Sequence, residues 1–174
     1  ARTAPANNKS FYPAVVPGVP LAFPRDHGAH PAYRTEWWYL TGWLRRLDGA
    51  RRGEPLGVQV TFFRSRTRHA ADNPSRFAPT QLLLAHAALA VPDRGRLLHA
   101  QRAARAGFGL ASAATHDTAV GIGGWTLART AEDRYRARVD DRDLAVTLEL
   151  APRTAPVAQG DGGFSRKGPR ATQA

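Results

Sequence analysis

One stretch of the chain, residues 23–44, brings together the side chains best suited to chemistry. It reads FPRDHGAHPAYRTEWWYLTGWL and holds three of the four tryptophans, close to acidic side chains and two histidines. From Thr35 to Trp43, aromatic and β-branched side chains predict a strand, in which successive side chains point to opposite faces. Glu36 then shares a face with Trp38. A carboxylate buried against indole must be paired, hydrogen-bonded or protonated, because an unpaired buried charge costs on the order of several kcal/mol.

Glu36 therefore has two interpretations. As a carboxyl kept neutral by burial it could act as a general acid, while aromatic faces stabilise a developing carbocation by cation–π attraction. This combination suits proton-initiated chemistry on an apolar, unsaturated ligand. In the alternative, Glu36 is structural and pairs with an arginine, for which the candidates are Arg25, Arg34 and Arg64. The sequence leaves both interpretations open.

The histidines of the same stretch could in principle bind a metal ion. Their spacing along the chain does not favour such a site. His27 and His30, with Asp26 and Glu36 nearby, offer imidazole and carboxylate ligands. They lie on an expected turn and match no dedicated zinc motif, so we expect the histidines to hydrogen-bond locally and predict no metal and no cofactor. Residues 160–167 contain neither a G-x-S-x-G nucleophile motif nor a phosphate-binding loop.

The elements that must position this stretch have the pattern of antiparallel strands separated by turns. Further strands are predicted at 56–64, 81–91, 97–102, 120–128, 134–139 and 144–150. The connection 64–79 is polar and basic and could cover a binding site as a flap. Residues 103–118 have poor strand chemistry, and one short helix is expected there. About seven strands at hairpin spacing predict an all-β antiparallel sandwich or barrel.

The length of 174 residues suits one domain with a self-sufficient core. Residues 1–24 are rich in proline and are expected to form an extended arm, because proline removes ladder donors. Residues 25–158 are assigned to the barrel. Residues 159–174 form a glycine-rich tail, interpreted as the start of a linker to a second domain absent from this chain.

The formal charge of +11 raises the question of an anionic partner. The arginines are scattered, without a basic helix or a block of five like charges, so we predict a solvated basic surface and no nucleic-acid partner. Adhesion to nucleic acid or anionic lipid remains a third alternative.

Two further features bear on the compartment. The absence of cysteine excludes disulfides and thiolate metal sites, and no apolar run is long enough for a transmembrane segment. Because the chain lacks an initiator methionine, we expect a processed, secreted or periplasmic protein.

Four blocks of the sequence resemble a known family. They are residues 23–44, residues 57–64 (GVQVTFFR), residues 84–89 (LAHAAL) and residues 159–168 (QGDGGFSRKG). In this order they resemble the carotenoid 1,2-hydratase (hydroxyneurosporene synthase) and AttH-like family, whose bacterial members are often labelled secreted hydrolases. The blocks cover nearly the whole chain.

This resemblance implies a lipocalin-like antiparallel β-barrel, the first of two such domains, with a ligand site in and between the barrels. Members act on apolar, polyene-like compounds: the hydratases add water across a terminal double bond by protonation, and distant fungal relatives guide cyclisations. This chain resembles the N-terminal domain only. A second lipocalin-like domain, in cis or as a separate fragment, is therefore an expected partner.

The resemblance also assigns roles to residues. Glu36 or Asp26 is the expected acid and His27 an orienting or relay group. Ligand-binding roles fall to Trp37, Trp38, Tyr39, Trp43, Gln59, Phe62, Arg64 and His86. The expected function is binding of a hydrophobic, unsaturated small molecule and, with a second domain, its proton-dependent hydration, isomerisation or hydrolysis. The alternative is a non-enzymatic carrier in which the same residues close one end of the barrel.

Overall fold

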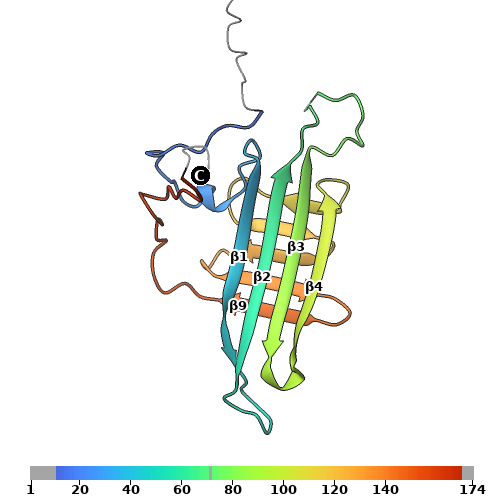
Figure 1. Ribbon diagram of the computed structural model, residues 1–174, viewed down its shortest axis with the longest axis vertical. Coiled ribbons are helices and arrows are strands. Elements are labelled where there is room, and N and C mark those ends of the chain that lie inside the picture. The colour runs from blue at the N-terminus through green and yellow to red at the C-terminus, as the bar shows by residue number, and fades with distance from the viewer. Residues whose placement is uncertain (1–10, 71, 170–174) are drawn as a thin grey trace, which may run out of the picture.

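The protein consists of two antiparallel sheets that lie one in front of the other (Figure 1). A computed structural model describes residues 11–70 and 72–169. The first sheet contains β1 (Thr35–Arg45), β2 (Pro55–Arg66), β3 (Gln81–Val91) and β4 (Arg96–Arg105). The second contains β5 (Ala111–Ala113), β6 (Ala119–Ile122), β7 (Trp125–Arg129), β8 (Tyr135–Asp140) and β9 (Ala145–Leu150). Two short 3-10 turns, η1 (Arg25–His27) and η2 (Pro92–Arg94), are the described helical segments, and neither is long enough to cross a membrane.

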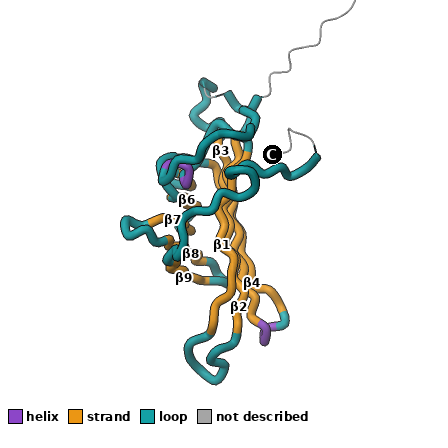
Figure 2. Tube along the Cα trace, turned by 90° about the vertical axis from the view of Figure 1, so that its left-hand side faces the viewer, coloured by secondary structure: helices purple, strands orange, loops and turns teal. Residues whose placement is uncertain are grey.

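Within each sheet, every strand pairs with the next strand in sequence. The strands of the second sheet run across those of the first, and the edge-on view shows two separate layers (Figures 1 and 2). The prediction of an all-β antiparallel fold is confirmed. Within residues 11–70 and 72–169, no strand ladder joins the two sheets into a closed barrel.

The first sheet has one inward face and one outward face, and β1 divides its side chains as the alternation predicts. Glu36, Trp38 and Leu40 point inward and are partly buried, and Trp38 and Leu40 pack against the core. Trp37 and Tyr39 point outward and are exposed. In the register between β1 and β2, Trp38 lies opposite Phe62 and Glu36 opposite Arg64. The inward side chains of β1 are therefore next to inward side chains of β2.

Apolar side chains from both sheets fill the space between the layers. Val60, Phe62 and Ala85 of the first sheet and Trp125 of the second are completely buried. The Trp125 indole nitrogen donates a hydrogen bond of 2.9 Å to the carbonyl of Asp140, so its one polar atom is satisfied. The interior is therefore a close-packed core of the usual kind.

Two predictions about the middle of the chain are wrong. No helix forms between residues 103 and 118: β4 continues to Arg105 because Ala103 and Ala104 pair with Leu84 and Leu83 of β3, and this pairing outweighs the weak strand propensity of alanine. The predicted strand 120–128 is two strands. Gly123 and Gly124 adopt φ of 53° and 90°, which is the conformation of a tight hairpin turn.

The described parts of the arm, the loop and the tail contain no regular strand. The predicted arm 1–24 and tail 159–174 lie partly outside the described residues. Residues 11–24 contain no strand and lead into η1, and a single bridge joins Asp161 to Phe164 in the tail. The connection between β2 and β3, predicted as a flap, is an irregular loop in its described part.

Gly28, which follows η1, lies too close to the second sheet to carry a side chain. A Cβ at this position would lie 2.6 Å from the carbonyl carbon of Thr115. The next residue, Ala29, donates its backbone N–H to the carbonyl of Ala114 at 2.7 Å. This contact fixes η1, and with it Asp26 and His27, against the loop before β6.

We therefore expect Gly28→Ala to lower the free energy of unfolding by about 1–3 kcal/mol, the usual cost of overpacking. Gly42→Ala is the matched control, because a Cβ at Gly42 in β1 would meet nothing within 4 Å. Urea unfolding measures both variants. Equal midpoints for the two variants would contradict the close approach.

Candidate functional site

The charged residues gather at one end of the first sheet, around the guanidinium of Arg64. This side chain is only 2% exposed. It donates to Glu36 Oε2 at 2.6 Å, to Gln81 Oε1 at 2.7 Å, and to the carbonyls of Tyr33 at 2.9 Å and His30 at 3.1 Å. One arginine thus joins β1, β2, β3 and the loop before β1.

Glu36 receives donors on both carboxylate oxygens. Besides Arg64, the backbone N–H of His30 lies 2.8 Å from each oxygen, and His30 Nδ1 lies 2.6 Å from Oε1. The side chain is 16% exposed. An ionised carboxylate accepts hydrogen bonds and donates none, so this set of partners fits a carboxylate.

His30 lies between two acidic groups. Its Nδ1 contacts Glu36, and its Nε2 lies 3.2 Å from Asp26 Oδ1. Neutral imidazole carries one N–H, whereas the imidazolium carries two and can donate to both carboxylates at once. The imidazole is 40% exposed, so it combines two carboxylate partners with access to solvent or a ligand.

Asp26 is held ionised by its neighbours. The Arg25 guanidinium, at 2.8 Å, and then the backbone N–H of Ala22 hold the pKa of Asp26 well below its usual range, with a smaller contribution from His30. The carboxylate is almost completely covered, whereas Arg25 is exposed. Asp26 is therefore a fixed negative charge beside His30.

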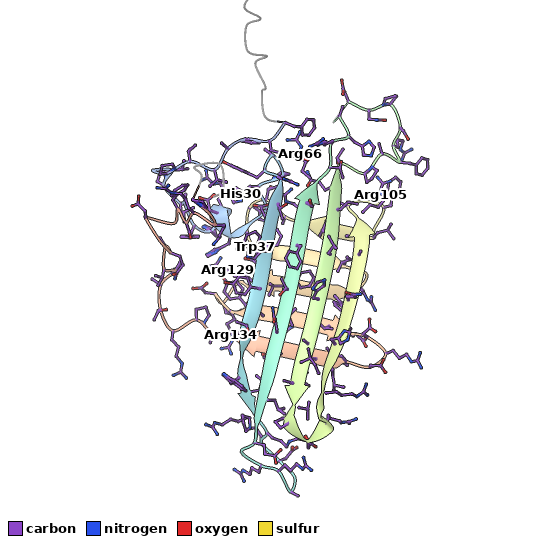
Figure 3. All side chains as sticks on the ribbon, viewed as in Figure 1. His30, Trp37, Arg66, Arg105, Arg129 and Arg134 are labelled. Atoms are coloured by element: carbon purple, nitrogen blue, oxygen red, sulfur yellow. The ribbon has the colours of Figure 1, made fainter. Side chains whose placement is uncertain are left out.

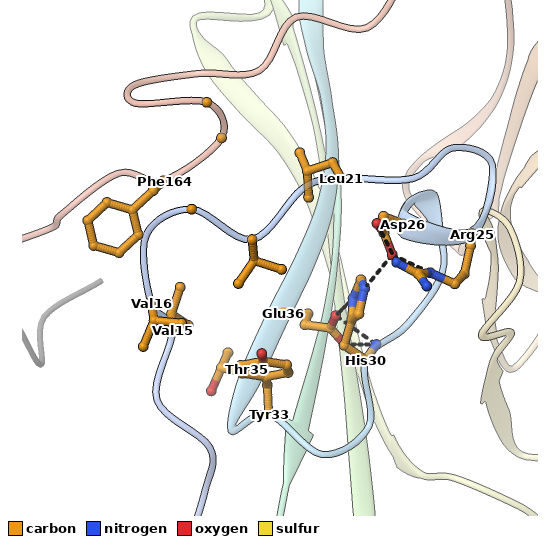
Figure 4. A pocket seen from close by; sticks show the side chains of 14 residues that line it. Val15, Val16, Leu21, Arg25, Asp26, His30, Tyr33, Thr35, Glu36 and Phe164 are labelled. Carbon is orange, nitrogen blue, oxygen red and sulfur yellow. Dashed lines mark hydrogen bonds and ion pairs between the residues drawn. The ribbon is translucent and has the colours of Figure 1, made fainter.

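A pocket of about 450 Å³ opens beside this cluster (Figure 4). Its polar wall contains Asp26, His30, Tyr33 and Glu36. The opposite wall is apolar and comes from the N-terminal arm and the tail, through Val15, Val16, Val19, Leu21 and Phe164. The arm and the tail thus enclose the charged end of β1 with a hydrophobic cover.

The structure distributes the predicted site residues over several places. Asp26 and Glu36 meet at the pocket, with Arg64 beneath them, whereas Phe62 lies in the sealed core between the sheets. Trp38 points inward, and its indole nitrogen donates to the carbonyl of His27 at 2.9 Å.

The remaining predicted ligand-binding residues lie on the outward face of the first sheet. They are Trp37, Tyr39, Trp43, Gln59 and His86, which project from β1, β2 and β3. Trp37 is visible on this face in Figure 3. A shallow hollow of about 510 Å³ includes Trp43 and Gln59.

His27 lies away from the 450 Å³ pocket, on a second hollow of about 720 Å³. Its ring packs against Phe23, with centroids 4.3 Å apart, and meets the edge of Tyr135 at 6.4 Å. Burial raises the pKa of Tyr135 above its ordinary value. Arg129 and Arg153 also line this hollow, which is more polar than the pocket beside Glu36.

Sequence reasoning missed two features of the pocket. His30 was expected to hydrogen-bond locally, as it does with Glu36, but it was not assigned to the ligand site, although it lies in the loop only six residues before Glu36 in β1. The apolar wall could not be predicted from the sequence, because Val15 and Leu21 belong to a proline-rich arm in which hydrophobic residues show no helix or strand periodicity. Among the described residues, no group of three or more acidic or histidine side chains is arranged to hold a metal ion.

Comparison with known proteins agrees with this architecture. A family model described as AttH-like matches residues 14–174. The chain belongs to the AttH-like family. A search of curated proteins finds no match.

A solved structure supports the same assignment for the fold. The crystal structure of a protein from Nitrosomonas europaea, described as a candidate AttH, matches this AttH-like chain with a TM-score of 0.79 and 47% sequence identity. The match covers 92% of this chain and 47% of that one, so this chain spans about half the length of its solved relative.

Because Arg64 is buried, we expect Glu36→Gln to lower the free energy of unfolding by about 3–5 kcal/mol, the cost of leaving a buried charge unpaired. Glu149→Gln provides the matched control: it breaks the pair with Arg136, in which both side chains are more than half exposed, and such pairs contribute about 0–1 kcal/mol. Chemical denaturation of both variants tests this difference. A Glu36→Gln cost as small as the control's would show that the pair is not structural.

The lowered pKa of Asp26 should make the free energy of unfolding depend on pH in the acid range. Its folded pKa lies below that of an unfolded aspartate, about 3.9, so the stabilisation is complete above that value and is lost as the pH falls further. We expect Asp26→Asn to flatten the decline in melting temperature from about pH 4 downward. If calorimetry shows the same decline in melting temperature at low pH for Asp26→Asn as for the wild type, the lowered pKa of Asp26 is contradicted.

Proposed function

We propose that the chain binds an apolar, unsaturated small molecule in the 450 Å³ pocket beside Glu36 and, with a second domain, promotes proton-dependent hydration, isomerisation or hydrolysis of it. The observation that carries the proposal is the composition of this one pocket. It combines a hydrophobic wall from the arm and tail with a polar wall that contains two carboxylates, one imidazole and the guanidinium of Arg25.

The hydrophobic wall favours an apolar ligand. Val15, Val16 and Leu21 are each about half exposed, although they line a concave site. Removing such side chains from water is favourable in proportion to the apolar area buried. A pocket of this volume lies within the range typical of small-molecule sites.

The polar wall supplies a group that can carry a proton. Glu36 is engaged by Arg64 and His30, and Asp26 by Arg25, so both suit the role of fixed negative charges. His30 bridges them and reaches the pocket. An imidazolium held in this way can donate a proton to a bound double bond or leaving group and recover it afterwards.

In this proposal Glu36 and Asp26 position His30 through their contacts with its two ring nitrogens, and the proton passes through His30. Trp38 holds the segment before β1 in place by donating a hydrogen bond to the carbonyl of His27. The outward aromatic residues, Trp37, Tyr39 and Trp43, lie on the other face of the sheet and take no part in this pocket. The relation to a lipocalin-like barrel stays a prediction from the resemblance.

The alternative of a non-enzymatic carrier is favoured by one observation, the extent of the bonding around Arg64. A buried guanidinium with four hydrogen-bond partners is typical of a side chain that stabilises the fold. In a carrier, the same cluster would close one end of the pocket and hold the arm without transferring a proton.

Titration with a fluorescent polyene fatty acid, cis-parinaric acid, tests the binding site. We expect saturable binding that Val16→Asp weakens about tenfold or more, because it places a charge in the apolar wall. Val157→Asp is the control: this valine is also exposed, at 71% against 52% for Val16, but it lines the other hollow. Loss of binding in the control alone would move the site to that hollow.

Product analysis in the same experiment separates enzyme from carrier. For the chain with its second domain, an enzyme gives a hydrated, isomerised or hydrolysed product that His30→Gln abolishes while parinaric acid still binds. Binding without product in the wild type identifies a carrier. His30→Gln is preferable to Glu36→Gln here because it leaves the Glu36–Arg64 pair in place.

A further inference from the structure

Two exposed phenylalanines meet at the end of the first sheet where β2 and β4 finish. Phe77, from the loop before β3, is 76% exposed, and Phe108, from the turn after β4, is 55% exposed. Their rings stack with centroids 5.8 Å apart and planes 5° apart. Leu110 follows Phe108 two residues later and is also exposed. Exposed apolar clusters of this kind commonly mark an interaction surface.

The backbone around Phe108 adopts a conformation that bulky residues rarely take. Phe108 has a φ of 55°, and its neighbours Gly107 and Gly109 have φ of 89° and 72°. Positive φ is unusual for an aromatic residue and is retained where the surroundings enforce it. Here two hydrogen bonds close the turn, from Gly107 N–H to Ala111 and from Leu110 N–H to Gly107. The turn presents the ring outward at a cost in backbone energy.

Arginines surround the aromatic pair. The Arg105 guanidinium lies 4.6 Å from the Phe108 ring centroid and donates to the carbonyls of Phe77 at 2.7 Å and Arg76 at 3.2 Å. It therefore holds the loop and the turn together. Arg66, at the end of β2, lies 5.2 Å from the ring of Phe11 in the arm.

The strand register places all these groups at one end of the molecule. Thr35 lies opposite Ser65, and Leu82 opposite both Ser65 and Arg105. Figure 3 shows Arg66 and Arg105 at this same end. The arginines here are Arg34, Arg66, Arg68, Arg76 and Arg105, and in the described part of the β2–β3 loop Asp72 is the one acidic side chain. Asp26 and Glu36 are already paired.

We propose that this end, defined by Phe11, Phe77, Phe108, Leu110 and the five arginines, docks on an anionic lipid membrane. Exposed aromatic and aliphatic side chains enter the boundary between headgroups and acyl chains, while arginines bind lipid phosphates. Nucleic acid would use the same cations. Because Phe108 already stacks on Phe77 and lies against Arg105, a base could not stack between the two rings, and the exposed apolar area of the pair favours lipid.

The proposal does not depend on ligand binding in the 450 Å³ pocket, yet the two sites are neighbours. Tyr33 and Thr35 line that pocket and lie at the same end of β1 as the docking surface. An apolar ligand held in the pocket would thus have a membrane close to its entrance.

Flotation of the full chain with lipid vesicles tests the docking surface. We expect binding to phosphatidylcholine vesicles that contain phosphatidylglycerol, weaker binding to phosphatidylcholine alone, and a decline with added salt. Phe77→Ser with Phe108→Ser should reduce partitioning by about tenfold or more, because two apolar rings no longer enter the lipid. Trp43→Ser is the control: this side chain is 79% exposed at the opposite end of the same sheet, and its loss should change partitioning less than about twofold.

Three outcomes would overturn the proposal. The double variant could partition like the wild type, the control could fall equally, or a single-stranded oligonucleotide could bind with the same dependence on both phenylalanines. Circular dichroism checks that each variant is folded. Should the double variant not fold, Phe77→Ser alone repeats the test, since Phe77 lies in an exposed loop.

Discussion

The buried ion pair between Arg64 and Glu36 is the interaction on which the rest of the charged end depends. A guanidinium removed from water must be fully bonded, and here its partners come from β1, β3 and the loop before β1. The same pair fixes Glu36, Glu36 fixes His30, and His30 extends toward Asp26. The positions of Glu36 and His30 in the pocket therefore depend on the buried guanidinium of Arg64. A substitution of Glu36 changes the stability of the sheet as well as the polar groups of the pocket.

Local pattern predicted much of the fold. The alternation along β1 placed Glu36 and Trp38 on one face, and the structure shows that this face is the inward one while the other is exposed. The ion pair of Glu36 with Arg64 bears out one of the three arginine partners that the sequence left open. The errors came where tertiary pairing decided the outcome. Ala103 and Ala104 form a strand only because β3 offers a partner edge, and Gly123 and Gly124 reverse the chain within a run that otherwise has strand composition.

The candidate site was less predictable because it depends on segments that are distant in sequence. The arm and the tail meet over β1 without any periodic signal, so the hydrophobic wall of the pocket appears only in three dimensions. Likewise, arginines that are scattered in sequence gather at one end of the sheet because β2 and β4 finish there. Membership of the AttH-like family and the similar solved structure agree with this all-β architecture.

The pairing of every strand with its sequence neighbour has a consequence for how the chain folds. Each sheet is a meander in which every strand pairs with its sequence neighbour, so apart from the longer β2–β3 connection each ladder can grow from a short loop whose closure costs little entropy. The contacts between the sheets are of another kind. They consist of core side chains and a few bridges, such as Arg102 to the carbonyl of Asp140. We therefore expect two locally formed meanders whose docking, with Trp125 sealed between them, limits the rate of folding.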